Sequence, residues 1–138
     1  MRILGVDPGE KRIGLAISDP TGTIASPLTV IHHISRHLDA ASIADLANQY
    51  QVEAIIIGKS LDEEGLPTPA SRRADRLAEA IRQQCDIPLQ MWDESFSTQI
   101  ARQAQLEMGT KRKRRSGHLD EMAATVILQS YLDSRINH

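Results

Sequence analysis

The chain has 138 residues, of which 41% are hydrophobic, 25% charged and only 3% aromatic, and its formal net charge is −2. This composition is typical of one globular domain covering residues 1–138, and the scarcity of aromatic residues disfavours base-stacking platforms. No apolar run reaches the roughly 20 residues needed to span a bilayer, and Met1 leads directly into a strand rather than a signal peptide. We therefore expect a cytoplasmic protein without a membrane partner.

The first sixteen residues predict a strand, a turn and a second strand. The apolar run Ile3 to Val6 ends in Asp7, and Ile13 to Ala16 forms the next apolar run. Pro8 fixes its own φ and Gly9 tolerates a positive φ, so residues 7–10 can form a tight turn. Asp7 would then face a cleft and could hold a metal ion. An Asp before Pro-Gly is equally typical of a simple turn, and the hairpin alone does not separate these interpretations.

Three further elements are expected before residue 58. Thr23 to Ile34 is rich in β-formers and predicts a third strand, whereas the apolar spacing from Ala40 to Tyr50 predicts a helix. Val52 to Ile57 is a short apolar run rich in β-branched residues. It predicts a strand buried on both faces and parallel to the first. Asp19, which precedes Pro-Thr-Gly, is interpreted as a turn former.

The second half alternates helices and strands. Gly58 to Pro67 predicts a loop, and Pro69 stands where a helix over 70–84 could begin. Its Ala74, Leu77, Ala78 and Ile81 share one apolar face. Ile87 to Trp92 predicts a fifth strand that ends in Asp93-Glu94, and a helix is expected from Ser97 or Thr98 to about Met108. A last helix should cover 117–134, with Met122, Val126, Ile127 and Tyr131 as candidates for its apolar face.

The predicted order of elements is βββαβαβαα. It implies an α/β fold with a mixed five-stranded sheet, in which a three-strand antiparallel meander precedes parallel strands, and with helices on both faces. Ligands gather at the carboxyl ends of parallel strands. The acids expected at such ends are Asp7, Asp93 and Glu94, and Asp120 at the start of the last helix is a fourth candidate.

Clustered carboxylates would suit hydrolysis of phosphodiesters. Mg²⁺ and Mn²⁺ prefer oxygen ligands, and two such ions about 3.5 to 4 Å apart can activate a water and stabilise the leaving oxygen. Nearby cations would hold the polyanionic strand. However, 86 positions separate Asp7 from Asp93 in the sequence. Spacing therefore does not establish that these acids converge, and a topology is needed to bring them together.

Several basic residues are candidates for phosphate contacts. Lys11 and Arg12 flank the Asp7 turn, and a run of five cations precedes the last helix: Lys111, Arg112, Lys113, Arg114 and Arg115. Each set could instead be solvated surface charge. Three arginines of the 70–84 helix, Arg72, Arg73 and Arg76, either form a basic stripe or pair with Asp75 and Glu79 on the same helix.

Ordered blocks spread over nearly the whole chain form a specific set. They are Leu4–Gly9 with Arg12–Asp19, then Ile55–Gly58, Asp93–Thr98, and Asp120–Ala124 with Ile127–Leu132. In this order they resemble the YqgF/RuvX family of pre-16S rRNA nucleases, relatives of Holliday junction resolvases in the ribonuclease H-like superfamily. The resemblance implies a ribonuclease H-like fold and a Mg²⁺- or Mn²⁺-dependent endonuclease. It implies Asp7, Glu94 and Asp120 as catalytic acids that bind the metal, with Asp93 beside them as a further metal ligand.

The resemblance favours processing of the 5′ end of pre-16S rRNA, with resolution of branched DNA junctions as the alternative. A resolvase would need a symmetric homodimer, whereas a processing nuclease could act as a monomer. A catalytically silent nucleic-acid-binding module is a second alternative. The chain also departs from the family pattern. Gly58-Lys59-Ser60 stands where the family has Gly-Leu-Pro, which adds Lys59 as a possible phosphate contact, and Ser95 replaces the Arg of Asp-Glu-Arg.

Overall fold

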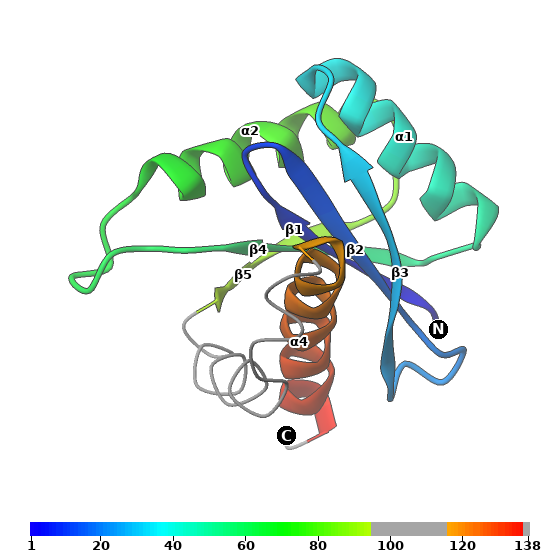
Figure 1. The fold of residues 1–138 in the computed structure, drawn as a ribbon. Coiled ribbons are helices and arrows are strands. Elements are labelled where there is room, and N and C mark those ends of the chain that lie inside the picture. Colours follow the sequence, from blue (N-terminus) through cyan, green and yellow to red (C-terminus); the bar gives the residue numbers. More distant parts are fainter. Residues whose placement is uncertain (95–115, 137–138) are drawn as a thin grey trace.

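A single mixed sheet forms the centre of the protein in the computed structural model, which describes residues 1–94 and 116–136, with side chains of the last helix described from 122 to 135 (Figure 1). Its order is β3-β2-β1-β4-β5. The strands are β1 (Ile3–Pro8), β2 (Arg12–Ser18), β3 (Ala25–His32), β4 (Ala54–Lys59) and β5 (Leu89–Asp93). β1, β2 and β3 pair antiparallel, whereas β4 is parallel to both β1 and β5. The predicted mixed sheet is confirmed.

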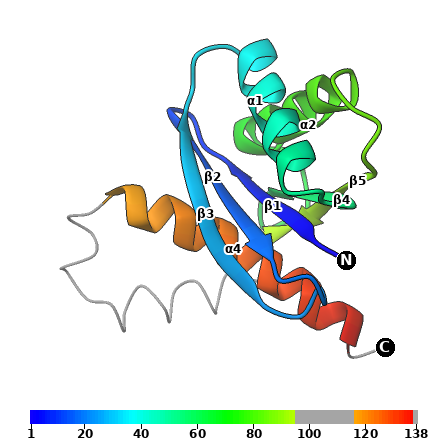
Figure 2. The same cartoon turned by 90° about the vertical axis from the view of Figure 1, so that its right-hand side faces the viewer.

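Helices cover both faces of the sheet, as predicted. Figure 2 shows α1 (Arg36–Gln49) and α2 (Pro69–Arg82) on one face and α4 (Ser116–Ile136) on the other. The helix predicted to end near Met108 lies outside the described residues. Within residues 1–94 and 116–136, no helix is both long enough and apolar enough to cross a membrane.

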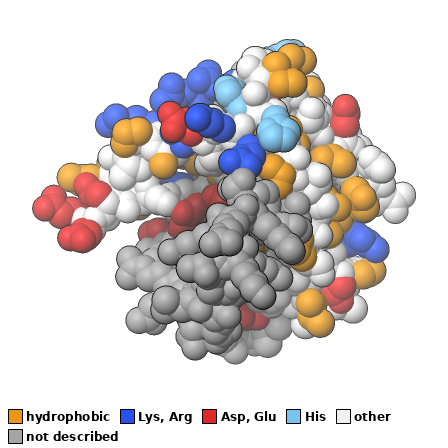
Figure 3. All heavy atoms as spheres, viewed as in Figure 1, with side chains coloured by type: hydrophobic (Ala, Val, Ile, Leu, Met, Phe, Trp, Pro, Cys, Tyr) orange, Lys and Arg blue, Asp and Glu red, His pale blue; other side chains and the backbone are white. Residues whose placement is uncertain are grey.

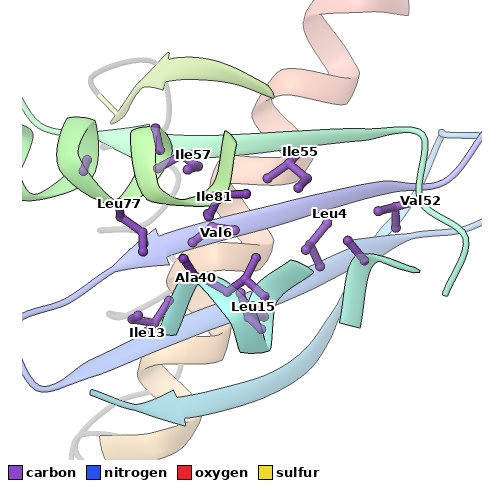
Figure 4. Close-up of a cluster of buried hydrophobic side chains, with 14 of the residues drawn as sticks. Leu4, Val6, Ile13, Leu15, Ala40, Val52, Ile55, Ile57, Leu77 and Ile81 are labelled. Carbon is purple, nitrogen blue, oxygen red and sulfur yellow. The ribbon is translucent and has the colours of Figure 1, made fainter. Parts of the chain in front are cut away.

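The larger core lies between the sheet and the α1/α2 pair. Leu4 and Val6 of β1 and Ile55 and Ile57 of β4 point toward these helices (Figure 4), and all four are at most 1% exposed. α2 contributes the apolar face that its periodicity predicts: Ala74, Leu77, Ala78 and Ile81. Burying such aliphatic side chains is the main source of stability in a domain of this size.

A smaller core lies under α4. Ala124, Leu128 and Leu132 of the helix are completely buried against Ile3 and Ile56 of the sheet. The predicted apolar face of this helix is incomplete. Val126 and Ile127 are buried, Met122 is half-buried, and the half-buried Tyr131 packs against this core, but the row at i, i+4, i+8 that starts at 124 and makes the main sheet contact was not predicted. The helix is apolar on most sides, so its periodicity alone did not define which row faces the sheet.

Several predicted boundaries of strands and helices differ from the observed ones, and two of the differences have a clear physical cause. α1 begins at Arg36 rather than Ala40 because the Ser35 side chain caps it, accepting a hydrogen bond of 3.2 Å from the Leu38 amide. Residues 58 and 59 belong to β4 rather than to the following loop, because Gly58 pairs with Trp92 and Lys59 with Asp93 on β5. The extra two residues carry β4 to the end of the sheet where the acidic residues lie.

Candidate functional site

Asp7 lies within the sheet and not in a turn. Its Cα partner on β2 is Gly14, and Pro8 still pairs with Ile13, so the loop of the hairpin is residues 9–11 and the predicted turn over 7–10 is wrong. Gly9 does not adopt a positive φ. A side chain at Gly9 would instead overlap the carbonyl oxygen of Arg12. Asp7 is therefore held by the ladder of a central strand.

The alternation of side chains along β1 places Asp7 on the α4 face. Ile3 packs in the core under α4, and a Cβ on Gly5 would lie only 2.8 Å from the Cβ of Leu128. Because successive residues of a strand point to opposite faces, Ile3, Gly5 and Asp7 share the α4 face. Asp7 is half-buried. Along the row Ile3, Gly5 and Asp7, it comes after the two residues that lie against the apolar side chains of α4.

Glu94 immediately follows β5 and lies over Gly58 of β4. Its Oε1 is 3.0 Å, and its Cγ 3.2 Å, from the position that a Cβ on Gly58 would take. The Cδ1 of Ile127 on α4 is 2.7 Å from the same position. Any side chain at residue 58 would therefore compete with the Glu94 carboxylate and with the helix. The glycine makes room for the acid on the α4 face of the sheet.

Asp7 and Glu94 converge on one end of this face. Val6 is the Cα partner of Ile57, so the parallel register puts Asp7 level with Gly58. Adjacent strands are about 4.8 Å apart, and Glu94 lies directly over Gly58. The topology thus brings together two acids that are 87 positions apart in the sequence, as the predicted site requires.

The tip of β5 is fixed against α4 by an aromatic contact. The rings of Trp92 and Tyr131 meet edge to face, with centroids 5.4 Å apart, and the Trp92 indole N–H donates to Ser130 Oγ at 3.3 Å. Trp92 shares the α4 face with Glu94, two residues later, by strand alternation. The contact therefore determines where the backbone before Glu94 sits relative to the last helix.

Ser60 is a site residue that the sequence did not single out for this role. Its hydroxyl donates a hydrogen bond to Glu94 Oε2, and its carbonyl oxygen accepts one of 2.6 Å from Thr68 Oγ1. Thr68 also caps α2, where its Oγ1 accepts from the Ser71 amide at 3.0 Å. The departure of Gly58-Lys59-Ser60 from the family pattern was the one available signal. Through Ser60, the Glu94 carboxylate is linked to Thr68 at the start of α2.

Asp93 and Lys59 lie on the other face. Asp93 is the Cα partner of Lys59, and both alternate with residues that face α4, namely Trp92 and Gly58. Their side chains therefore project toward the α2 side of the sheet. Both residues are half-buried. The structure does not bring Asp93 to Asp7 and Glu94, although the three acids are near one another along the strand ends.

The remaining predicted residues divide between the site and the undescribed part of the chain. Arg12 shares the α4 face with Asp7 because it lies on the same face of β2 as Gly14 and Ala16, at positions two and four residues later, and Lys11 is exposed in the hairpin loop. Asp120 falls in the first turns of α4, one turn before Ala124, and its side chain lies outside the described residues. The basic run and Ser95 also lie outside them: Lys111, Arg112, Lys113, Arg114 and Arg115.

Asp19 has the turn-forming role predicted for it. Its carboxylate accepts hydrogen bonds from the amides of Ile24, at 2.9 Å, and Thr23, at 2.8 Å, and from the Thr21 hydroxyl. The Ile24 amide, followed by the Thr21 hydroxyl and the Thr23 amide, holds the pKa of Asp19 well below its usual 3.8. These bonds keep the carboxylate in the β2–β3 connection and away from Asp7.

Comparison with known proteins decides the family. The model of the family described as "RuvX: Holliday junction resolvase" matches residues 1–134. The chain belongs to the RuvX family. A relative from Clostridium acetobutylicum named "Putative pre-16S rRNA nuclease" is 39% identical over 97% of this chain and 99% of its own length. One of the same name from Syntrophomonas wolfei is 38% identical over 96% of this chain and 94% of its own.

Solved structures agree on the fold of this RuvX family member. A Thermus thermophilus RuvC in complex with a Holliday junction substrate superimposes with a TM-score of 0.64, covering 99% of this chain and 96% of its own at 13% identity. The fowlpox virus resolvase in complex with Holliday junction DNA gives a TM-score of 0.57 at 14% identity, with 99% of both chains covered. The predicted ribonuclease H-like fold is confirmed, in a family of nucleases.

Proposed function

We propose that this RuvX family member is a Mg²⁺- or Mn²⁺-dependent endonuclease that hydrolyses phosphodiester bonds at the 5′ end of pre-16S rRNA in the cytoplasm. The observation that carries the proposal is the convergence of Asp7 and Glu94 on one end of the α4 face. The names of the curated relatives favour the ribosomal precursor as substrate.

The residues at this end of the sheet fit a divalent cation. Asp7 and Glu94 offer only oxygen donors, which Mg²⁺ and Mn²⁺ prefer. Gly58 leaves space beneath Glu94, and the Ser60 hydroxyl occupies Oε2 of that acid, so that Oε1 lies over the glycine. The proposed ligands are Asp7, Glu94 and Asp120. Asp93 is left out of this set because strand alternation turns it to the opposite face.

Asp120 is proposed as the third acid from its position in α4. It stands four residues before Ala124 in the row that continues with the completely buried Leu128 and Leu132. One helical turn rises about 5.4 Å, and the two residues from Gly5 to Asp7 rise about 6.6 Å along the strand. Figure 2 shows the N-terminal end of α4 on the side of the β1–β2 hairpin. The helix row and the β1 row thus advance toward the same end of the molecule.

The protein's own groups would bind and orient the substrate. Ser60 restrains the Glu94 carboxylate, and Arg12, on the same face as Asp7, would contact a phosphate beside the reacting bond. Lys11, Lys59 and the 111–115 run would hold neighbouring phosphates. A bound divalent cation supplies Lewis acidity and makes water a stronger nucleophile at neutral pH. Water is the proposed nucleophile, so that no covalent enzyme intermediate is needed.

The test compares cleavage of a precursor 16S 5′-end RNA and a four-way DNA junction with Mg²⁺, Mn²⁺ or a chelator. We expect metal-dependent cleavage of the RNA that Asp7→Asn lowers about a thousandfold, because each lost interaction of this kind contributes several kcal/mol to the transition state. Asp45→Asn, which changes an exposed acid on α1, is the matched control and should leave the rate unchanged. Binding of both probes without cleavage would contradict the nuclease and favour a binding module.

Junction resolution is the second candidate because the matching family model carries that description. It requires two sites on two strands and therefore a homodimer. Sedimentation with the junction bound separates the two functions. A 2:1 complex that cuts the junction symmetrically, and leaves the precursor RNA intact, would replace rRNA processing by resolution. A monomer on the junction would exclude resolution.

A further inference from the structure

A polar cavity lies on the α1/α2 side of the sheet, the side opposite the face that carries the candidate active site. It has a volume of about 460 Å³ and is bounded by the β1–β2 hairpin, the start of α1 and the first turns of α2. The charged and histidine side chains of its lining are Glu10, His33, Arg36, Asp39, Arg73 and Arg76. In Figure 3, Lys, Arg and His side chains gather at the top of the molecule, over α2 and toward α1. We call this cavity the arginine pocket.

Positive charge dominates the arginine pocket. Three guanidinium groups face two carboxylates, but Asp39 is only 2% exposed and both of its oxygens are engaged. One accepts from the Ile34 amide at 3.1 Å and the other is 2.5 Å from Nδ1 of His33. Among the described residues of the lining, Glu10 is therefore the one exposed acid. Guanidinium groups bind phosphate oxygens in pairs, with geometry that a solvated ammonium lacks.

His33 is oriented by this arrangement. Asp39 holds Nδ1, and the His33 amide donates to the carbonyl of Lys11 at 2.9 Å, which ties the end of β3 to the hairpin loop. The imidazole is 46% exposed, so Nε2 remains the ring atom that can meet a ligand. A buried carboxylate that fixes one ring nitrogen of a histidine determines where the other nitrogen points. His33 and Asp39 thus form a fixed polar part of the lining, which the pocket shares with the arginines of α2.

The position of the pocket links it to the nuclease site. Pro8 and Gly9, which follow Asp7 directly, form part of its lining. A strand whose reacting bond lies at Asp7 on the α4 face would reach the arginine pocket by passing around the end of the hairpin. Among the described residues, the lining contains no Phe, Tyr or Trp, so these residues offer no surface on which a base could stack. The chemistry favours the phosphate backbone and not the bases.

We propose that the arginine pocket binds a backbone phosphate of the substrate nucleic acid flanking the reacting bond, through Arg73 and Arg76 of α2 together with Arg36 and His33. This inference rests on the proposed nuclease function. It assigns to α2 a second anchoring point, on the face of the sheet opposite the acids. Of the three arginines Arg72, Arg73 and Arg76, it uses Arg73 and Arg76, which line the pocket, whereas Arg72 is not among the described residues of the lining.

The experiment measures binding without cleavage, by fluorescence anisotropy in a chelator, of labelled precursor 16S 5′-end RNA and a labelled four-way DNA junction. The double variant R73A/R76A should bind about tenfold more weakly and lower the slope of log affinity against log salt by about 2. R72A/R82A removes the same charge from the same helix outside the pocket and should bind like wild type. Glu10→Gln removes the opposing acid and should tighten binding.

Each result decides for or against the pocket. Weaker binding by R73A/R76A alone, together with tighter binding by Glu10→Gln, supports it. Equal losses in both double variants would show a general charge effect and overturn it, as would wild-type affinity in R73A/R76A. In either case, metal-dependent cleavage by the wild type would leave the nuclease intact. Absence of binding and cleavage by the wild type would overturn both proposals. Glu10→Gln keeps the test decisive if the double variant unfolds, because it alters only an exposed loop residue.

Discussion

The two faces of β1 and β4 differ toward the end where the acids lie. Toward α1 and α2 both strands continue with large aliphatic residues, Val6 and Ile57, whereas toward α4 the aliphatic Ile3 and Ile56 give way to Gly5 and Gly58, where the helix and Glu94 approach, and then to Asp7. The alternation of a strand allows this, because adjacent residues never share a face. One face therefore holds the fold together, while the end of the other is free for chemistry. Substitutions at neighbouring positions should consequently have separate effects.

The largest expected effect on stability comes from the α1/α2 face. Ile57→Ala deletes a completely buried side chain from the larger core and should lower the free energy of unfolding by about 2–5 kcal/mol. Urea denaturation measures the loss. Cleavage per folded molecule should be unchanged, because Ile57 points away from the acids. Ile24→Ala, at a side chain that is 61% exposed, is the control and should change stability by less than about 0.5 kcal/mol.

Gly58→Ala, one residue later, should affect both stability and activity. The new methyl group would lie 2.7 Å from Ile127 Cδ1 and 3.0 Å from Glu94 Oε1, so something must shift, at a cost of about 1–3 kcal/mol. Displacement of Glu94 should also lower the cleavage rate. Gly65→Ala tests the opposite situation, because nothing lies within 4 Å of a Cβ at that position. The only strain on the new alanine would come from the positive φ of residue 65. Wild-type cleavage by Gly58→Ala would contradict the placement of Glu94.

Ser60→Ala should act mainly on metal affinity. The variant removes the hydroxyl that donates to Glu94 Oε2, and loss of a hydrogen bond that orients a ligand typically weakens metal binding about 10–100-fold. Titration of Mn²⁺ against cleavage measures the change. Ser60→Thr retains the hydroxyl and should recover most of the affinity. Equal Mn²⁺ dependence in wild type and Ser60→Ala would remove Ser60 from the site.

Asp19→Asn should have the smallest effect, and one that depends on pH. Because the Ile24 and Thr23 amides and the Thr21 hydroxyl hold the pKa of Asp19 below its unfolded value of 3.8, the wild type gains stability above that pH. The gain is lost as pH falls through the depressed pKa. The difference in Tm between wild type and variant should be largest near neutral pH and shrink toward about pH 2. A difference that grows in acid would contradict this sign.

Local pattern predicted most of the elements. Alternation and β-branching predicted the strands, and the spacing of Ala74, Leu77, Ala78 and Ile81 predicted the buried face of α2. The boundaries at Arg36 and Gly58 were missed because they depend on a cap and on pairing with β5, which no local pattern contains. The resemblance of ordered blocks supplied the candidate acids, without any information on which face of the sheet each one takes.

By itself, the sequence determined the elements of this protein, its fold class and its candidate acids, because these follow from short-range periodicity and from ordered motifs. Only the tertiary structure decided which residues meet. The parallel register of β1 and β4 brings Asp7 level with Gly58, Glu94 lies over that glycine with Ser60 bonded to it, and strand alternation turns Asp93 away. These are contacts between segments far apart in the chain. They depend on strand order and register, which are set by the packing of the whole sheet.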